Sequence, residues 1–319
     1  MVKKTVICSL KLVILKNNIL KAHLALLGAN VIYGVNYLIA KGVMPDKIGP
    51  SAFVFLRIAG AGLLFWFIKS FIKEKVDTKD FPRLILCGAL GIATNQLTFF
   101  HGLNLTSPID ASIIITAVPI VAVVFGSILL KEKITKNKLL GITIGGLGAV
   151  FLIAYGNQSE GTSSLLGNLL VFINAIAFGL YLVLIKPMMK KYNSITIISW
   201  VFLFGFVCMF PFGITDIMNT DFSAFTSQTY FAVAFVIIGT TFLAYLFNIY
   251  ALNYVSPAVT GSYIYLQPVV SFIMVSIYAY VLGYSEYAQD INPVKITSCF
   301  LVVIGVYLIS KAPKKKTLS

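Results

Sequence analysis

Charged residues are scarce in this chain of 319 residues. Only 11% of its side chains are charged, while 58% are hydrophobic and the mean hydropathy is +0.91. Soluble globular domains carry about a quarter charged residues, because their surfaces face water. The composition therefore excludes a soluble globular protein, and it indicates a polytopic membrane protein whose main partner is the lipid bilayer.

Residues that commonly carry catalysis, metal binding or cross-links are also few, with two His, four Cys and eleven Asp or Glu in total. The cysteines lie far apart without metal-type spacing, and we interpret them as small apolar packing residues; they are Cys8, Cys87, Cys208 and Cys299. The chain has no zinc-type His-Glu pair, no Gly-x-Ser-x-Gly elbow and no phosphate-binding loop. The sequence therefore favours a protein that is not an enzyme, and it predicts no metal site and no cofactor.

Long apolar segments, in contrast, occupy most of the chain. A helix needs about 20 apolar residues to cross a bilayer, and ten segments come near or above that length. They are Leu20–Met44, Pro50–Phe71, Phe81–Leu103, Ser107–Leu130, Leu139–Tyr155, Leu165–Ile185, Ile195–Ile217, Tyr230–Leu252, Ser256–Leu282 and Ile296–Ile309. We predict an all-α membrane protein with ten transmembrane helices.

Basic residues are distributed unevenly along the chain, which has a net charge of +14. If the N-terminus is cytoplasmic, 21 of the 25 Lys and Arg residues fall in inner segments. Lys41, Lys47 and Lys295 would lie outside, and Arg57 would lie within a span. The positive-inside rule explains this asymmetry without any nucleic-acid partner, and it predicts a multi-pass protein of the cell inner (plasma) membrane with both termini cytoplasmic.

One phrase of the sequence occurs twice. Residues 103–119 and 252–268 agree at six of seventeen positions, including a Ser-Pro pair and a second proline eleven residues later. Gly34 and Lys41 are seven residues apart, as are Gly179 and Lys186. Each half holds five predicted spans, and because five is odd the second half must enter the membrane from the opposite side. Two inverted repeats are a common construction of secondary transporters, with the ligand site near the midplane.

These repeats give the predicted domain boundaries. Residues 1–21 form a cytoplasmic lead-in, 22–155 the first five-helix repeat, 156–164 an outside linker, 165–311 the second five-helix repeat and 312–319 a basic cytoplasmic tail. The linker is rich in Gly and Ser, which is typical of a connecting loop.

The residues named so far, with a few further motifs, resemble the drug/metabolite transporter superfamily, and more narrowly its ten-span, EamA-type branch. The motifs are Asn-x-x-Tyr-Gly-x-Asn-Tyr-x-x-x-Lys at 30–41, the lone Arg57, Asn-Gln-x-x-Phe-x-x-Gly-Leu at 95–103, the repeated Ser-Pro phrase and Leu-Lys-Glu-Lys at 130–133. The resemblance covers almost the whole chain. It implies an exporter of amino acids and related metabolites, whose central cavity is enclosed mainly by spans one to four and six to nine.

The prolines of the repeated phrase fall into two classes. Pro108 and Pro257 follow a serine that can cap a helix, and they are expected in a first turn where the missing N–H is harmless. Pro119 and Pro268 are expected in mid-helix, where each removes a hydrogen bond and bends the helix. We interpret this second pair as hinges for alternating access, the alternative being static kinks that serve packing only.

Charge within the apolar segments is the next signal. Arg57 and Asp110 both lie near the outer face in the predicted topology, and a buried Arg costs about 2.5–3.5 kcal/mol on insertion scales. The two residues could form a structural ion pair, Arg57 could bind the carbonyls of a helix end, or Arg57 could bind a substrate carboxylate. His101 and Asp110 are the candidates for proton coupling, because a His titrates near neutral pH and burial can bring an Asp toward it.

Residues that break the repeat in a polar way are the better candidates for substrate binding. Amides within spans are also candidates, since facing lipid would be costly for them. The predicted substrate-binding residues are Asn36, Arg57, Asn95, Gln96, Tyr245, Asn248, Tyr263 and Gln267.

The sequence thus predicts a carrier that exports a small-molecule substrate, an amino acid or related compound, by alternating access. The alternatives are a membrane-embedded transferase and, among transporters, a drug, nucleotide-sugar or organic-anion carrier. A stripe of small residues at 141–149 could serve internal packing or a homodimer contact.

Overall fold

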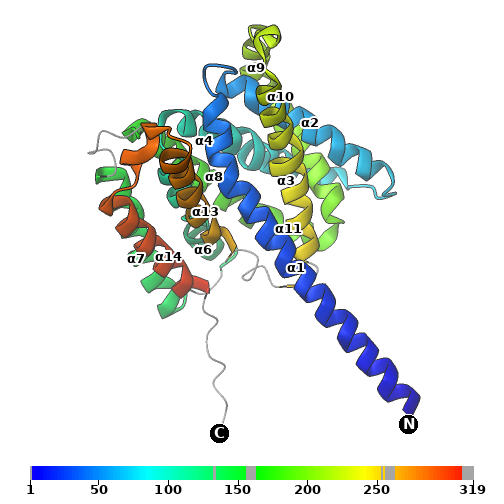
Figure 1. Cartoon of the computed structure of the whole chain (residues 1–319). Coiled ribbons are helices and arrows are strands. Elements are labelled where there is room, and N and C mark those ends of the chain that lie inside the picture. The colour runs from blue at the N-terminus through cyan, green and yellow to red at the C-terminus, as the bar shows by residue number, and fades with distance from the viewer. Residues whose placement is uncertain (1, 132–133, 156–162, 253, 256–262, 311–319) are drawn as a thin grey trace.

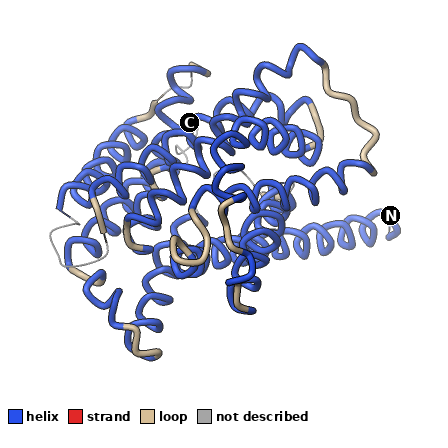
Figure 2. The backbone as a smooth tube through the Cα atoms, turned by 90° about the horizontal axis from the view of Figure 1, so that it is seen from above, coloured by secondary structure: helices blue, strands red, loops and turns tan. Residues whose placement is uncertain are grey.

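The computed structural model describes residues 2–131, 134–155, 163–252, 254–255 and 263–310. In that part of the chain every regular element is a helix, and the tube in Figure 2 contains no strand. Nine of the described helical segments are long and apolar enough to cross a membrane, and Pro293–Gly305 is a shorter apolar helix. The prediction of an all-α protein with ten membrane helices is confirmed.

The first repeat holds five spans, two of which consist of more than one helical element. Its elements are α1 (Val2–Val43), α2 (Pro50–Ser70), η1 (Thr78–Asp80), α3 (Phe81–Gly88), the π-helix η2 (Ala89–Thr94), α4 (Asn95–Leu105), α5 (Pro108–Ile115), α6 (Val118–Leu129) and α7 (Lys136–Tyr155). Helix α1 is continuous, so the predicted lead-in and the first span form one helix, whose N-terminal part extends beyond the bundle in Figure 1.

The second repeat follows the same order as far as α11, and its described part has three additional short helices after it. Its elements are α8 (Leu165–Lys191), α9 (Ser194–Met218), η3 (Phe222–Ala224), α10 (Ser227–Ala234), the π-helix η4 (Phe235–Leu243), α11 (Ala244–Leu252), η5 (Tyr263–Tyr265), α13 (Leu266–Ser276), the π-helix η6 (Ile277–Val281), η7 (Ser285–Asp290) and α14 (Pro293–Ser310). The second Ser-Pro pair, residues 156–162 of the predicted linker (156–164) and the predicted tail at 312–319 lie outside the described residues.

Helix contacts follow the two-fold relation that inverted repeats require. Helix α4 of the first half packs on α8, the first helix of the second half, and its counterpart α11 packs on α1. In the same way α6 packs on α8 while α13 packs on α1. The two remaining close pairs, α2 with α9 and α7 with α14, join counterparts directly. Figure 1 shows α7 and α14 side by side at one edge of the bundle.

Two equivalent glycines show that this relation extends to side-chain packing. A Cβ at Gly34 of α1 would lie 2.5 Å from Val270 Cβ, and a Cβ at Gly179 of α8 would lie 2.6 Å from Val121 Cγ1. Positions 34 and 179 are equivalent in the repeat, and so are 121 and 270. Both glycines are therefore needed because a neighbouring helix approaches too closely for any larger residue.

The small-residue stripe of α7 packs inside the chain. A Cβ at Gly145 would lie 3.6 Å from the Cα of Gly305, and a Cβ at Gly148 would lie 2.7 Å from Leu301 Cβ. Both Gly305 and Leu301 belong to α14. Internal packing, one of the two predicted roles of the stripe, thus accounts for the close contact of α7 and α14.

π-Helical segments interrupt the third and eighth spans at equivalent places. The segment η2 ends at Thr94 and η4 ends at Leu243, which the repeat aligns. Each lies against the first helix of the other half, since Thr240 donates a hydrogen bond to Asn36 Oδ1 at 3.2 Å and Tyr181 lies directly against Gly91. π-Turns are rare and occur mostly at functional sites. The two segments therefore indicate a candidate site where the two halves meet.

The two predicted hinge prolines are not in mid-helix, which corrects the sequence-based expectation. Pro119 lies at the start of α6, after a break at Thr116 and Ala117, and Pro268 is the third residue of α13. The break lies before the proline because the ring cannot fit against a preceding helical turn, whereas it fits a first turn without loss of a hydrogen bond. The fourth span is therefore divided into α5 and α6 rather than bent within one helix, and in the described part of the ninth span α13 begins two residues before Pro268.

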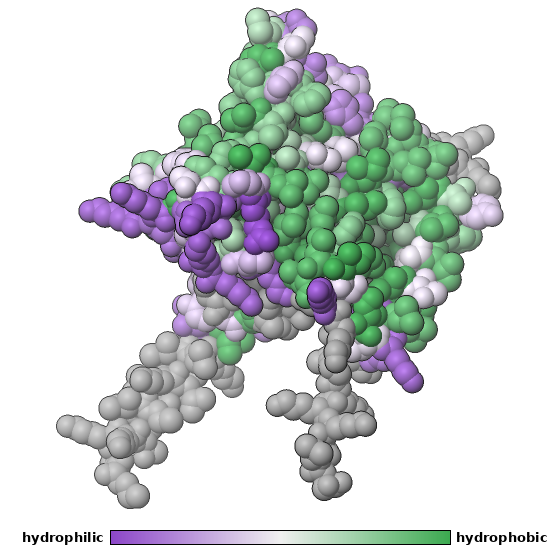
Figure 3. Space-filling model, turned by 180° about the vertical axis from the view of Figure 1, so that it is seen from behind, coloured by the Kyte–Doolittle hydropathy of each residue, from purple (hydrophilic) through white to green (hydrophobic). Residues whose placement is uncertain are grey.

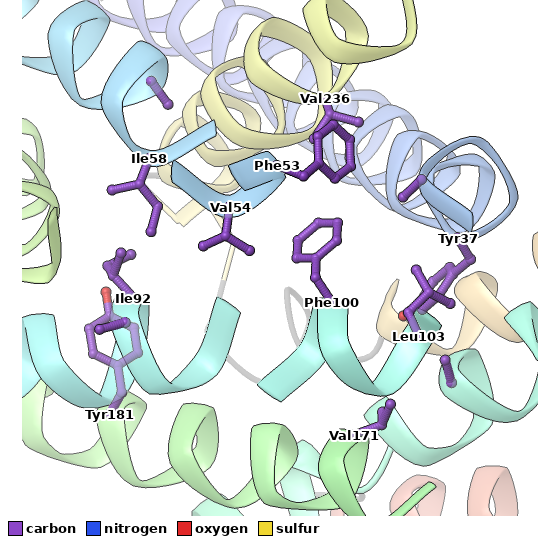
Figure 4. Packing of buried hydrophobic residues seen from close by; sticks show 14 of the residues in the cluster. Tyr37, Phe53, Val54, Ile58, Ile92, Phe100, Leu103, Val171, Tyr181 and Val236 are labelled. Carbon is purple, nitrogen blue, oxygen red and sulfur yellow. The ribbon is translucent and has the colours of Figure 1, made fainter. Parts of the chain in front are cut away.

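The outer surface fits a lipid environment. Figure 3 shows one face largely covered by hydrophobic residues, with hydrophilic ones gathered on one side. The hydrophobic core lies between the helices, and in Figure 4 Phe53 of α2 and Phe100 of α4 face one another, with ring centroids 5.3 Å apart. The chain is a multi-pass membrane protein.

Candidate functional site

Arg57 is buried in the middle of the bundle, with 5% of its surface exposed. It lies on α2, and its guanidinium carbon is 5.0 Å from the centroid of the Phe100 ring, a cation–π contact. Its Nε donates a hydrogen bond to Thr241 Oγ1 at 2.5 Å. Thr241 uses its own proton toward Val236 O, so its oxygen accepts from Arg57. No carboxylate of the described residues lies within ion-pair distance of Arg57.

Aromatic and amide side chains surround this cation. Tyr33 of α1 and Tyr245 of α11 lie close enough to Arg57 to interact electrostatically with it, and Tyr33 also lies near Asn248. Asn248 donates to Ala244 O at 2.7 Å. The tyrosines and Asn248 are half-buried. We call Arg57, Thr241, Tyr33, Tyr245 and Asn248 the arginine cluster.

A second polar group lies where η2 passes into α4. Asn174 of α8 donates from Nδ2 to the backbone carbonyl of Asn95 at 2.7 Å, and Gln96 donates from Nε2 to Asn95 Oδ1 at 2.9 Å. These three residues, which we call the amide cluster, are 2–7% exposed. The oxygens Asn174 Oδ1 and Gln96 Oε1 accept no hydrogen bond within the described part of the chain.

A third group contains charges and lies at the end of the bundle where α4 meets α5. The Lys295 ammonium is 3.0 Å from Asp110 Oδ1 and 2.9 Å from Asp290 Oδ1, and it donates to Ser107 and Ser163 at 3.2 and 3.0 Å. Asn168 donates to Asp110 Oδ2 at 3.3 Å. The side chains of Lys295, Asp110 and Asp290 are fully buried. We call Lys295, Asp110 and Asp290 the lysine cluster.

This arrangement contradicts the ion pair between Arg57 and Asp110 that the sequence offered as one interpretation. Asp110 pairs with Lys295, and Arg57 contacts Thr241 and Phe100 instead. The predicted topology puts Lys295 at the outer end of a span, and its side chain is fully buried in the protein. It lies in the first turn of α14, in the second half, and reaches a carboxylate of the first half.

Other predicted site residues connect helices. Gln267 of α13 accepts from Tyr37 at 2.8 Å and donates to Asn30 Oδ1 at 3.0 Å, which ties α13 to α1. Asn36 accepts from Thr240, as described above. These amides are buried and their contacts are made within the protein.

Two more candidates lie at opposite ends of the bundle. Tyr263 hydrogen-bonds His23 Nδ1 at 2.8 Å at the end that carries the basic loops. His101 is half-buried and shares a 2.9 Å hydrogen bond with Ser51 at the other end. The structure thus brings Arg57, Tyr245 and Asn248 together and joins Asn95 to Gln96, while Tyr263 and His101 are separate from both groups.

Five residues of these groups were missed from the sequence, namely Tyr33, Asn174, Thr241, Asp290 and Lys295. Asn174 carried a signal, because it is an amide in the middle of an apolar segment, the reason for which Asn95 was chosen. Tyr33 lies in the motif at 30–41, and Lys295 has Lys138 as its counterpart in the repeat. Nothing in the sequence separated Thr241 from the many other hydroxyl residues.

Comparison with known proteins agrees with this architecture. The model of the EamA-like transporter family matches residues 20–154 and again 165–311. An uncharacterized transporter of Archaeoglobus fulgidus is 26% identical over 264 residues, which are 82% of this chain and 89% of that protein. The uncharacterized transporter YyaM of Bacillus subtilis is 25% identical over 306 residues, 93% of this chain and 97% of that protein.

Two further similarities are more distant. A probable terminal-alkyne amino-acid exporter of Streptantibioticus cattleyicolor is 23% identical over 241 residues, 73% of this chain and 74% of that protein. A solved crystal structure with 16% identity superposes with a TM-score of 0.59, covering 90% of this chain and 96% of the other. It has the same fold. Because the family model matches each of the two five-span repeats, the chain belongs to the EamA-like transporter family and is a membrane transporter.

Proposed function

We propose that this transporter is a carrier that exports a small metabolite, an amino acid or a related compound, by alternating access. The observation that carries the proposal is Arg57, a buried cation in the middle of the bundle with no carboxylate partner among the described residues. Charged residues within membrane spans are costly, and they commonly belong to substrate pathways.

An anionic group of the substrate would supply the missing partner. A guanidinium presents donors in a planar fork that fits a carboxylate with two hydrogen bonds, and only Nε is engaged by Thr241. The partly exposed Tyr33, Tyr245 and Asn248 would contact the rest of the molecule. An amino acid is the substrate class we favour, and the similarity to a probable amino-acid exporter supports it.

Alternating access is proposed from the inverted repeat. The fourth span is divided before Pro119 and the ninth span has Pro268 in the first turn of α13. Each proline lies in the first turn of a helix at an equivalent place in the repeat, so the two halves can exchange conformations around a central site. Pro119 and Pro268 are therefore proposed as the hinges.

The proposal also includes the orientation of the protein in the membrane and the energy source for export. The basic loops are placed on the cytoplasmic side of the plasma membrane, with both termini cytoplasmic. Proton entry is proposed to drive export at Asp110, which shares Lys295 with Asp290 in the lysine cluster. His101 is the second candidate for proton coupling, since its ring bonds Ser51 at the same end.

Transport by the purified protein in liposomes tests the role of Arg57. With a panel of amino acids and organic acids, we expect saturable uptake of at least one amino acid. Arg57→Ala should lower kcat/KM by 10- to 100-fold, because a charge-assisted hydrogen bond contributes about 1.5–3 kcal/mol. Arg57→Lys should recover only part of the loss, because a lysine cannot form two parallel hydrogen bonds to a carboxylate.

Arg83→Ala is the matched control, because Arg83 is exposed at the start of α3. This variant should transport normally. Normal transport by Arg57→Ala would show that the substrate is bound elsewhere, and saturable transport of organic acids alone would replace the amino acid by an organic anion.

A further inference from the structure

We infer that the amide cluster of Asn95, Gln96 and Asn174 binds the protonated amino group of the substrate, so that the carrier selects a zwitterion over a simple organic anion. The inference rests on the proposed function, because Arg57 is taken to hold the carboxylate. It adds a second subsite to the one at Arg57, and it includes Asn174, which was not among the predicted site residues.

The unpartnered oxygens are the first observation. Asn174 Oδ1 and Gln96 Oε1 are buried and accept no hydrogen bond from the residues that the structure describes. Native proteins pair most buried polar atoms, and the exceptions call for an explanation such as a ligand. Both oxygens belong to side chains that contact the same residue, Asn95, and both are acceptors, so the ligand they suit is a hydrogen-bond donor.

The direction of the Asn174 amide is fixed by its partner. Its Nδ2 donates to the backbone carbonyl of Asn95, and a carbonyl can only accept. Exchanging the amide's nitrogen and oxygen would place two acceptors against one another, so Oδ1 must point away from that contact. Gln96 continues the same chain of hydrogen bonds, since it donates to Asn95 Oδ1.

Position relative to Arg57 is the second observation. Gln96 and Phe100 are four residues apart on α4, so they lie on one helix face with about 6 Å of axial rise between them. The Phe100 ring is 5.0 Å from the Arg57 guanidinium carbon. A small zwitterion that makes a hydrogen bond of about 3 Å at each of its two charged groups spans a distance of the same order as the separation between Gln96 and Arg57.

The repeat supplies the third observation. The positions equivalent to Asn174, Asn95 and Gln96 are Ala29, Ala244 and Tyr245, so the place that the repeat relates to the amide cluster has no amide. Tyr245 instead belongs to the arginine cluster. The two matched places have therefore diverged, since one carries amide acceptors and the other carries a tyrosine beside the cation. A molecule with one positive and one negative group satisfies both the amide acceptors and Arg57.

A neutral amide cluster suits an amino group for a chemical reason. An ammonium has three donors and no acceptor, while a hydroxyl or keto oxygen at the same place would bring lone pairs toward Asn174 Oδ1. A site built to accept hydrogen bonds discriminates strongly against an analogue that lacks the donor. The amides also carry no charge of their own, so the site does not attract inorganic cations as a carboxylate would.

The test compares one transported amino acid with its 2-hydroxy acid analogue, which has the same carbon skeleton and carboxylate but no amine. In proteoliposomes we expect the wild-type protein to prefer the amino acid at least tenfold in kcat/KM. Asn174→Leu should raise KM for the amino acid about tenfold, leave KM for the hydroxy acid within twofold, and bring the preference near one.

Asn219→Leu, an exposed amide at the end of α9, is the control and should keep the preference. If Asn174→Leu does not fold, as judged by gel filtration in detergent, Gln96→Met serves in its place with the same expectation. Equal transport of both compounds by the wild-type protein, or an equal loss for both in the variant, overturns the inference while the proposed function stands. Absence of saturable transport of either compound overturns the proposed function and the inference with it.

Discussion

At the scale of single residues, two buried cations have different neighbours. Lys295 is 3.0 Å or less from two carboxylates, whereas Arg57 contacts a hydroxyl and an aromatic ring. A buried ion pair that is fully hydrogen-bonded holds elements in place, while a buried cation without a carboxylate has binding capacity left for a ligand. Lys295 is therefore expected to matter for structure, and Arg57 for transport.

Lys295→Met tests the structural role. The change would leave Asp110 and Asp290 buried without their shared cation, and breaking a buried pair in this way costs about 3–5 kcal/mol of unfolding free energy. We expect a lower midpoint of thermal unfolding in detergent. The matched control is Lys138→Met, because Lys138 is the counterpart of Lys295 in the repeat. The counterpart of Asp110 is Val259, so Lys138 has no equivalent carboxylate to pair with. The control should stay within about 0.5 kcal/mol of wild type, and equal losses in both variants would contradict this role.

Asp110→Asn tests proton coupling. Asp110 faces Lys295 from α14, Asp290 from η7 and Asn168 from α8. If its carboxylate takes up the driving proton, the amide variant should lose the stimulation of transport by an imposed pH gradient while exchange of labelled for unlabelled substrate continues. Proteoliposomes with and without the gradient measure both rates. His101→Gln should leave the stimulation unchanged, and the opposite result for the two variants would transfer the coupling role to His101.

At the scale of elements, the interruptions of the helices matter most. Two π-helices and two helix starts with proline occur at equivalent places in the halves, and each lies near a residue of the candidate site. Asn95 and Gln96 directly follow η2, and Tyr245 is the second residue after η4. A π-turn changes which side of the helix the following residues face, so these interruptions orient the site residues inward.

Pro119→Ala and Pro268→Ala test the hinges. Because both prolines lie in a first helical turn, neither removal restores a hydrogen bond, and stability should change by about 1 kcal/mol or less. An alanine does not exclude a helical turn before it as a proline does, so each span can straighten during transport, and the maximal rate should fall several-fold with KM nearly unchanged. Pro211→Ala is the control, since Pro211 lies inside the continuous helix α9 and is exposed. Unchanged rates in both hinge variants would leave the breaks with a packing role only.

At the scale of the whole molecule, the two-fold pairing of helices decides the architecture. The halves interlock, because the first helix of each packs on the third and fourth spans of the other. Neither half therefore has a complete core of its own. The arginine cluster draws its residues from both halves, as expected for a site that two rocking units enclose.

Cysteine labelling tests the orientation. In a protein whose four cysteines are replaced by alanine, Lys75→Cys marks an exposed position at the basic end and Gln228→Cys marks an exposed position at the opposite end. We expect a membrane-impermeant maleimide to label Gln228→Cys in intact cells, and Lys75→Cys only after permeabilisation, because basic loops stay in the cytoplasm. Labelling in the reverse order would invert the topology and with it the direction of export.

The sequence by itself determined the number and the approximate limits of the spans, the duplication and the family. The reason is that a membrane helix satisfies its backbone within its own segment, so its signal is local along the chain. Arg57, Asn95 and Gln96 were also visible, because polar residues inside apolar runs stand out in any membrane sequence.

Only the tertiary structure decided which of these polar residues meet. Lys295 and Asp110 are 185 positions apart, and Asn174 and Asn95 are 79 apart, so no local pattern could pair them. The π-turns of the third and eighth spans also appear only in the structure, where each lies against the first helix of the other half. In the sequence, Arg57 and Lys295 are both single cations near apolar runs. Packing between distant segments gives Lys295 two carboxylate partners and leaves Arg57 available for a ligand.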